Sequence, residues 1–186
     1  MNERVAGIIA KLERFMSQRK EAKPVPPDAG RFIHALLLAQ RARHTVEIGT
    51  NYGYSGLWTA AALAETGGKM ISIDHDPEKT KAAMATFEEA GLSAYVELRT
   101  GTAAEVLPSI DGPIDFVLSD ADKDNCIQYV ELTADKLRPG GVVLTDNAHT
   151  HAEELAGFLA WIRHRADFYT TTVSVGNGME LSVKRA

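Results

Sequence analysis

Two acidic segments of this sequence carry oxygen-bearing side chains at spacings that suit a divalent metal ion. Residues 119–125 contain Asp120, and residues 145–147 contain Asp146 and Asn147. Carboxylate and amide oxygens are hard ligands, which favour Mg²⁺, Ca²⁺ or Mn²⁺ over Zn²⁺. Either segment alone is typical of a solvated acidic turn. Two such turns after neighbouring strands instead predict one metal site formed by Asp120, Asp146 and Asn147, with coordination positions left for water or substrate oxygens.

Three residues beside this predicted site have side chains that could take part in chemistry. Lys123 follows Asp120 by three positions, where a neighbouring divalent cation would favour its neutral, proton-accepting form. We therefore predict that Lys123 is a catalytic base, with a surface lysine as the alternative. His149 and His151 come soon after and could contact substrate or metal, or could simply begin a helix. The sequence leaves that choice open.

A glycine-spaced stretch over residues 45–56 predicts a ligand-binding turn between a strand and a helix. The strand ends at Gly49 and the helix begins near Tyr54, so the first N–H groups of the helix can face a ligand. The spacing departs from G-x-G-x-x-G because Asn51 occupies the place of the middle glycine, which disfavours a pyrophosphate. Glu47, inside the apolar strand, needs a partner such as an ammonium group or backbone donors. Glycines that serve only helix packing are the alternative, but Glu47 favours a cationic amino-acid ligand.

Polar residues after the second and third predicted strands indicate contacts with a nucleoside. Asp74 is placed as a carboxylate that accepts hydrogen bonds from ribose hydroxyls, because Asp76 already provides the cap of the next helix. His75 could lie along an adenine face or could be a surface loop histidine. Residues 101–103 offer backbone donors at the same edge, with a helix N-cap as the alternative role of Thr102.

The elements that position these residues alternate between short apolar strands and amphipathic helices, a pattern typical of βαβ units around a parallel sheet. The predicted strands cover residues 45–49, 70–74, 94–99, 114–119 and 142–146, and the predicted helices cover residues 3–19, 28–43, 54–65, 77–90, 102–109, 124–137 and 151–165. Residues 168–175 and 179–184 alternate around a Gly-Asn-Gly turn and predict a terminal hairpin. The expected fold is α/β and Rossmann-like, with a mostly parallel seven-stranded sheet, a C-terminal antiparallel hairpin and helices on both faces.

Two local signals complete this prediction. Asp28 is expected to cap the second helix, and the Pro139-Gly140-Gly141 sequence is expected to close a helix before the fifth strand. The first helix has an apolar face that must cover another surface. Packing on its own domain is favoured over a subunit contact or a lid above the ligand site. We also expect a homodimer that forms through the N-terminal helices and the hairpin.

Length and composition predict one catalytic unit that acts on a small molecule. The chain has 186 residues, of which 45% are hydrophobic and 24% are charged. An N-terminal helix and proline-rich connector over residues 1–27 precede a single domain over residues 28–186. A net charge of −5 without a dense Lys/Arg cluster argues against nucleic acid or membrane partners. The charged N-terminus and the single Cys126 favour a cytoplasmic location.

Taken together, these motifs resemble the cation-dependent O-methyltransferases that use S-adenosylmethionine (SAM), the family of catechol and caffeoyl-CoA O-methyltransferases. The resemblance runs from about Asp28 to the C-terminus and rests on V-E-I-G-T-N-Y-G-Y-S at 46–55, I-D-H-D at 73–76, D-A-D-K-D-N at 120–125, D-N at 146–147 and G-N-G-M-E-L at 176–181. The D-A-D-K-D-N motif looks more like the plant and bacterial branch than the animal one. The resemblance implies the Rossmann-like fold of class I methyltransferases.

The resemblance also implies roles for individual residues. The predicted cofactor-binding residues are Glu47, Gly49, Thr50, Asn51, Gly53, Ser55, Asp74, His75, Thr102, Ala103 and Asp120. The amino-acid end of SAM is expected to contact Glu47, Gly49, Asn51 and Ser55, the ribose Asp74, and the adenine Ala103. The residues implied to bind the divalent metal, with Mg²⁺ favoured over Ca²⁺ or Mn²⁺, are Asp120, Asp146 and Asn147. Lys123 matches the base that is proposed for the family.

The function implied is SAM-dependent methyl transfer to a hydroxyl of a small phenolic, catechol-like acceptor. A coenzyme A thioester is disfavoured because the site segments lack a basic cluster for its phosphates. An NAD(P)-dependent oxidoreductase is the main alternative, but it leaves the second acidic turn without a role. A metal-independent methyltransferase acting on RNA or protein would require a basic face, and a non-catalytic nucleotide-binding module would not require Lys123.

Overall fold

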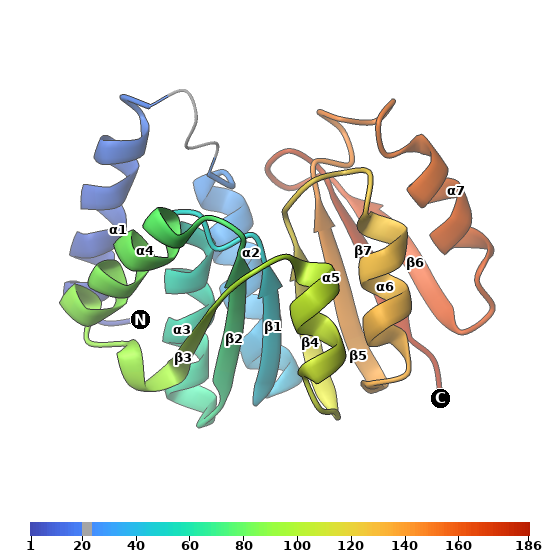
Figure 1. Ribbon diagram of the computed structural model, residues 1–186, viewed down its shortest axis with the longest axis horizontal. Coiled ribbons are helices and arrows are strands. Elements are labelled where there is room, and N and C mark those ends of the chain that lie inside the picture. The colour runs from blue at the N-terminus through green and yellow to red at the C-terminus, as the bar shows by residue number, and fades with distance from the viewer. Residues whose placement is uncertain (20–23) are drawn as a thin grey trace.

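The computed structural model describes residues 1–19 and 24–186 and is built around a sheet with the strand order β3-β2-β1-β4-β5-β7-β6 (Figure 1). The strands are β1 His44–Ile48, β2 Lys69–Asp74, β3 Val96–Thr100, β4 Ile114–Ser119, β5 Leu137–Asp146, β6 Phe168–Val173 and β7 Met179–Lys184. Strands β1 to β5 pair in parallel, whereas β7 is antiparallel to both of its neighbours, β5 and β6. The predicted seven-stranded sheet with its antiparallel C-terminal hairpin is confirmed.

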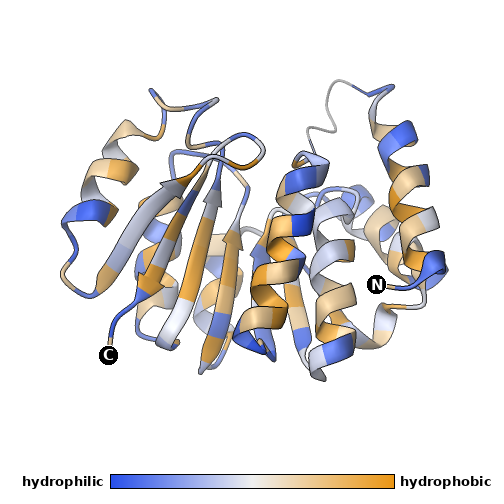
Figure 2. Cartoon of the chain, turned by 180° about the vertical axis from the view of Figure 1, so that it is seen from behind, coloured by the Kyte–Doolittle hydropathy of each residue, from blue (hydrophilic) through white to orange (hydrophobic). Residues whose placement is uncertain are grey.

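Helices cover both faces of the sheet, as predicted. They are α1 Glu3–Met16, α2 Pro27–Gln40, α3 Tyr54–Thr66, α4 Pro77–Ala90, α5 Ala103–Val106, α6 Cys126–Ala134 and α7 Ala156–His164. One apolar core packs the helices α1, α2, α3 and α4 against the sheet face that carries Phe116 and Leu118. A second core packs α5, α6 and α7 against the opposite face, which carries Val117 and Val143. Alternate strand residues thus point to opposite faces. Figure 2 shows hydrophobic residues along the central strands, which is typical of a sheet buried on both sides.

The strand order reverses between β1 and β4, and this reversal places the site. The chain runs from β1 outward through β2 and β3, and then returns to lay β4 and β5 on the opposite side of β1. Connections from adjacent strands therefore leave in opposite directions at the carboxyl ends of β1 and β4, which opens a crevice there. The glycine turn follows β1, and the segment with Asp120 follows β4.

The beginning of β5 differs from the prediction. The strand starts at Leu137, so the Pro139-Gly140-Gly141 sequence lies within it and does not close a preceding helix. Its pairing with β4 shifts register between Ile114 and Phe116. This irregularity accommodates a proline, which cannot donate to a strand ladder, next to two glycines.

Five helices, α1, α2, α5, α6 and α7, are shorter than predicted, and one predicted cap is wrong. The helix predicted over residues 102–109 is α-helical only to Val106 and continues as a short 3₁₀ turn, because Pro108 cannot donate the next helical hydrogen bond. The helix predicted over residues 151–165 begins only at Ala156, after a series of turns. The capping position of α2 is occupied by Pro26, and the Asp28 carboxylate instead accepts a hydrogen bond from the backbone N–H of Gly176 at 3.0 Å.

Helix α1 packs on its own domain, against α3 and α4, which is the favoured alternative from the sequence. Its apolar face buries Val5, Ile9, Leu12 and Met16, and Lys11 forms an ion pair with Glu89 of α4 at 2.7 Å. Part of the predicted connector, residues 20–23, lies outside the described residues. Within residues 1–19 and 24–186, none of the helices combines the length and apolar character needed to cross a membrane.

Candidate active site

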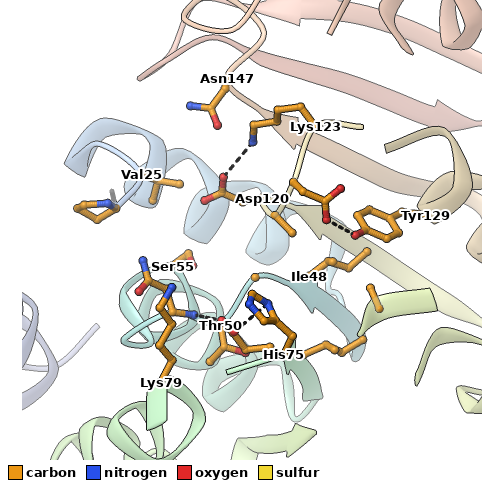
Figure 3. Close-up of a pocket in the computed structure, with 18 of the residues that line it drawn as sticks. Val25, Ile48, Thr50, Ser55, His75, Lys79, Asp120, Lys123, Tyr129 and Asn147 are labelled. Carbon is orange, nitrogen blue, oxygen red and sulfur yellow. Dashed lines mark hydrogen bonds and ion pairs between the residues drawn. The ribbon is translucent and has the colours of Figure 1, made fainter. Parts of the chain in front are cut away.

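A cavity of about 970 Å³ opens at the carboxyl ends of the central strands (Figure 3). The predicted site residues that line it are Gly49, Thr50, Asn51, Ser55, Asp74, His75, Thr102, Ala103, Asp120, Lys123 and Asn147. Three other predicted residues, Glu47, Gly53 and Asp146, do not contribute to the lining. Eleven of the fourteen predicted site residues therefore line the cavity.

The turn after β1 depends on glycine because the backbone of the next loop is pressed against it. Gly49 has a φ of +103°, and a Cβ atom at this position would collide with the backbone carbonyl oxygen of Asp120. Its N–H donates to the carbonyl oxygen of Ile73 at 2.9 Å. The turn that follows β1 and the acidic loop that follows β4 are therefore in direct contact at Gly49.

Replacing Gly49 with alanine is expected to destabilise the fold by about 3 kcal/mol, because the new Cβ adds a steric collision to an unfavourable positive φ. Urea unfolding of the variant would measure this loss. Gly157 is a matched control, since a Cβ there meets no atom within 4 Å and its replacement by alanine inside α7 should be neutral or stabilising. Equal stabilities of the Gly49 variant and the wild type would contradict the close contact.

Glu47 is 1% exposed and finds its partners in two serine hydroxyls. Its Oε1 accepts a hydrogen bond from Ser55 Oγ at 2.6 Å, and its Oε2 accepts one from Ser72 Oγ at 2.5 Å. Burial raises the pKa of Glu47 to about 7, although both hydrogen bonds oppose this shift. Within the protein, the backbone donors expected from the sequence are replaced by side chains of α3 and β2.

The raised pKa of Glu47 predicts a pH-dependent loss of stability. The unfolded chain releases this proton near pH 4.5, whereas the folded chain retains it to about pH 7. The folded state thus holds more protons in this interval, and its free energy of unfolding falls as the pH rises, by up to about 3 kcal/mol. Urea unfolding at several pH values should show the Glu47→Gln variant gaining stability relative to wild type across this interval. A constant difference between the two proteins would contradict the assignment.

The second strand supplies the carboxylate that was predicted to meet a ribose. Asp74 lines the cavity and accepts hydrogen bonds from the backbone N–H groups of Asn51 at 2.7 Å and Asp76 at 3.0 Å. Asp76 caps α4, as predicted, so Asp74 is not needed for that purpose. The His75 side chain is 79% exposed at the rim, 3.7 Å from Asp74.

Thr102 serves as the N-cap of α5, which was the alternative role considered from the sequence. Its side chain accepts a hydrogen bond from the backbone N–H of Glu105, and the Glu105 carboxylate accepts one from the backbone N–H of Thr102, forming a capping box. Thr102 and Ala103 nevertheless line the cavity beside Asp74.

The acidic end of the cavity brings the predicted metal ligands close to the predicted base. The Lys123 Nζ lies 3.6 Å from Asp120 Oδ1, and both side chains are largely buried. Burial and the neighbouring Asp146 charge raise the pKa of Asp120 to about 7. Burial also raises the pKa of Asp146. Two carboxylates are thus held close enough for their charges to interact.

The donor set at this end suits a divalent cation. Asp146 Oδ1 is buried without a hydrogen-bond partner, and Asn147 donates its amide Nδ2 to Thr150 Oγ1 at 3.2 Å, so that its Oδ1 remains available. A cation would offset the repulsion between the carboxylates. Among residues 1–19 and 24–186, no three His, Cys, Asp or Glu side chains are grouped to hold a metal ion, so the predicted set depends on Asn147 as its third ligand.

The loop that carries Lys123 is ordered by a residue the sequence analysis passed over. Asp122 accepts hydrogen bonds from Tyr129 Oη at 2.5 Å and from Asn125 Nδ2 at 2.6 Å. Asp122 and Tyr129 both line the cavity, as Figure 3 shows for the labelled Tyr129. The clustering of acids in D-A-D-K-D-N was a signal, but the contact with Tyr129 depends on how α6 packs.

The hairpin turn between β6 and β7 holds the segment that follows the predicted metal ligands. The Asn177 carbonyl accepts hydrogen bonds from the backbone N–H groups of His149 at 3.0 Å and Thr150 at 3.3 Å. A Cβ on Gly178 would collide with the His149 ring. His151 lines the cavity, whereas His149 packs against the hairpin and does not. Of these two histidines, His151 is thus the one that lines the cavity.

Residues distant in sequence close the opposite side of the cavity. Met16 at the end of α1 and Val25 before α2 line it, each with 2% exposure. Helix α1 is fixed there by the Tyr54 hydroxyl, which donates to Glu13 at 2.7 Å. No local motif marks Met16 or Val25 as site residues, so sequence reasoning missed them. The end of α1 is therefore part of the cavity wall as well as a cover for its own domain.

Comparison with known proteins agrees with this geometry. The family model described as O-methyltransferase matches residues 3–156. A catechol O-methyltransferase from Niastella koreensis is 35% identical over 127 residues, which are 66% of this chain and 57% of that protein. Caffeoyl-CoA O-methyltransferase 1 from Arabidopsis thaliana is 38% identical over 126 residues, 64% of this chain and 48% of that protein. The chain thus spans about half the length of the curated relatives it matches.

Two solved structures are similar over the whole chain. An O-methyltransferase from Bacillus cereus in complex with SAH has a TM-score of 0.86 and 27% identity, and the alignment covers 100% of this chain and 92% of that chain. An O-methyltransferase from Streptomyces achromogenes in complex with SAM has a TM-score of 0.84 and 27% identity, with 100% and 91% coverage. These alignments confirm the predicted fold class.

Proposed function

The chain belongs to the O-methyltransferase family, as its motifs indicated, and we propose that it transfers the methyl group of SAM to a hydroxyl of a small catechol-like acceptor with a divalent metal. The observation that carries this proposal is a single cavity with two different ends. The glycine turn, Asp74 and Ala103 line one end, and Asp120, Lys123 and Asn147 line the other. A cofactor and an acceptor bound at these two ends would meet within the same cavity.

SAM as the cofactor is supported by the complexes of the two structural relatives with SAH and SAM. In this chain, we assign Asp74 to the ribose, and Thr50 and Ser55, which also line the cavity, to the amino-acid end. The N–H groups of the first turn of α3 suit the carboxylate of that amino acid.

A divalent metal, with Mg²⁺ favoured over Ca²⁺ or Mn²⁺, would be held by Asp120, Asp146 and Asn147. When bound, such an ion would favour ionisation of an acceptor hydroxyl. We propose that Lys123, 3.6 Å from Asp120, accepts the proton released by that hydroxyl.

The proposal extends to the class of acceptor and to the assembly of the chain. The relatives named catechol and caffeoyl-CoA O-methyltransferases support a vicinal dihydroxy phenol. The acidic character of the chain favours a small acceptor over nucleic acid, membrane or a coenzyme A thioester. We retain the prediction of a cytoplasmic homodimer, and light scattering of the purified chain would test its oligomeric state.

The decisive experiment is methylation of a panel of phenols with SAM, in Mg²⁺ and after treatment with a chelator. We expect singly methylated products from vicinal dihydroxy phenols in Mg²⁺, and none from the corresponding meta-dihydroxy phenols. Product formation that survives chelation would overturn the metal-assisted mechanism. Calorimetric titration with SAM and with NAD distinguishes the oxidoreductase alternative, which predicts that NAD binds and SAM does not.

A further inference from the structure

Ser72 of β2 is a fully buried polar residue that the proposed reaction does not use. It is 0% exposed and does not line the cavity. Its hydroxyl nevertheless joins Glu47 Oε2 at 2.5 Å to Thr50 Oγ1 at 2.6 Å. Thr50 and Ser55 both line the cavity, and Ser55 contacts the other oxygen of the same carboxylate. Ser72 thus belongs to a buried chain that ends at two hydroxyls on the cavity wall.

The directions of the hydrogen bonds in this chain follow from counting protons. Above about pH 7, where Glu47 is ionised, its two oxygens can only accept, so Ser55 and Ser72 each donate their single hydroxyl proton to it. Because the Ser72 proton is used in this way, the contact of 2.6 Å requires Thr50 to donate to Ser72. The hydroxyl protons of Thr50 and Ser55 therefore point into the protein, and only lone pairs remain to face the cavity.

We propose that Ser72 is a positioning residue that orients the hydroxyls of Thr50 and Ser55, with the Glu47 carboxylate behind them, as acceptors for the ammonium group of the cofactor. The inference rests on the proposed function, because it assigns the amino-acid end of SAM to this wall. Two acceptors backed by a negative charge suit a cation, and Asp74 adds a second negative charge that acts on Glu47. Without Ser72, the Thr50 proton could rotate toward the cavity and oppose an ammonium group.

The test compares two ligands that differ in the ammonium-bearing end. S-Adenosylhomocysteine carries the amino acid, whereas 5′-methylthioadenosine has the same adenosine and sulfur without it. Calorimetric titration at pH 8, where Glu47 is ionised, should show that Ser72→Ala weakens the binding of S-adenosylhomocysteine about tenfold, the effect of losing one hydrogen bond to a charged group. Binding of 5′-methylthioadenosine should stay within about twofold of wild type. A general loss of structure would weaken both ligands, so the difference between them reports on the ammonium end alone.

A matched control is available in the same sheet. Ser182 of β7 is 1% exposed and bonds to Thr170 at 2.9 Å, so Ser182→Ala removes an equally buried hydroxyl remote from the cavity. We expect it to leave the affinity for both ligands unchanged. If Ser72→Ala does not fold, Ser72→Cys keeps nearly the same side-chain volume with a weaker hydrogen-bond donor. This variant should also lose affinity for S-adenosylhomocysteine selectively, but by a smaller factor.

The outcomes separate this inference from the proposed function. Selective loss of S-adenosylhomocysteine binding supports the positioning role. Equal losses for both ligands, or no loss for either, overturn it while leaving SAM as the cofactor. If wild-type protein binds neither ligand, the proposed function itself fails.

Discussion

Replacing Asp146 with alanine is expected to lower kcat for catechol methylation by at least about 1,000-fold, because the predicted metal ligands supply several kcal/mol of transition-state stabilisation. Mn²⁺ affinity, measured by calorimetry, should fall in parallel. SAM affinity should stay close to the wild-type value, since Asp146 does not line the cavity. The variant should fold, because Asp146 Oδ1 has no hydrogen-bond partner and its charge repels Asp120.

The control for this variant is Asp111→Ala, which removes an exposed carboxylate just before β4. Asp111 lies near the amino end of this strand, whereas the cavity lies at the carboxyl ends of the strands. The control variant should leave kcat, Mn²⁺ affinity and SAM affinity unchanged. A metal site at Asp146 would be disproved if the Asp146 variant bound Mn²⁺ as tightly as wild type. Unchanged Mn²⁺ affinity with lost activity would instead show that Asp146 acts on the acceptor.

Replacing Lys123 with methionine is expected to lower kcat by about 100-fold to 10,000-fold, the usual contribution of a general base. Methionine keeps an unbranched apolar stem of similar length, so the buried wall beside Asp120 should remain filled. Affinities for SAM and Mn²⁺ should change little, which would separate lost chemistry from lost binding. Steady-state kinetics with a saturating catechol would measure the effect.

Lys79→Met provides the matched control, because Lys79 also lines the cavity but does not pair with Asp120. Its kcat should remain within about threefold of the wild-type value. Comparable losses in the two variants would indicate a general electrostatic role for cavity lysines. A Lys123 variant with wild-type kcat would rule out this residue as the base.

The fold could be predicted from sequence because its signals are local and agree with one another. The pattern of apolar runs gave β4 its observed bounds, and Pro77 with Gly91 marked both ends of α4. The start of β5 escaped prediction because a Pro-Gly-Gly sequence ordinarily ends an element, and only pairing with β4 retains it in the sheet. The turns before α7 were missed because they depend on contacts with the β6–β7 hairpin, which is distant in sequence.

The site was predictable where its chemistry is encoded in adjacent residues. Asp74, Asp120, Lys123 and Asn147 all line the cavity, because each lies at the carboxyl end of a strand or within a few residues after it. Met16 and Val25 carry no such signal, since an apolar residue on a cavity wall looks like any core residue in sequence. The Glu47 partners were also hidden, because Ser72 meets Glu47 only through the pairing of β1 with β2.

The contact between the β6–β7 turn and residues 148–150 has a consequence for protein engineering. The carbonyl groups of Asn177 and Gly178 accept hydrogen bonds from all three backbone N–H groups of this segment. The absence of a side chain on Gly178 also makes room for His149. A loop transplanted from a relative to change acceptor preference would lose these contacts unless its own hairpin turn came with it. The two segments thus form one module for exchange, although nearly thirty residues of sequence separate them.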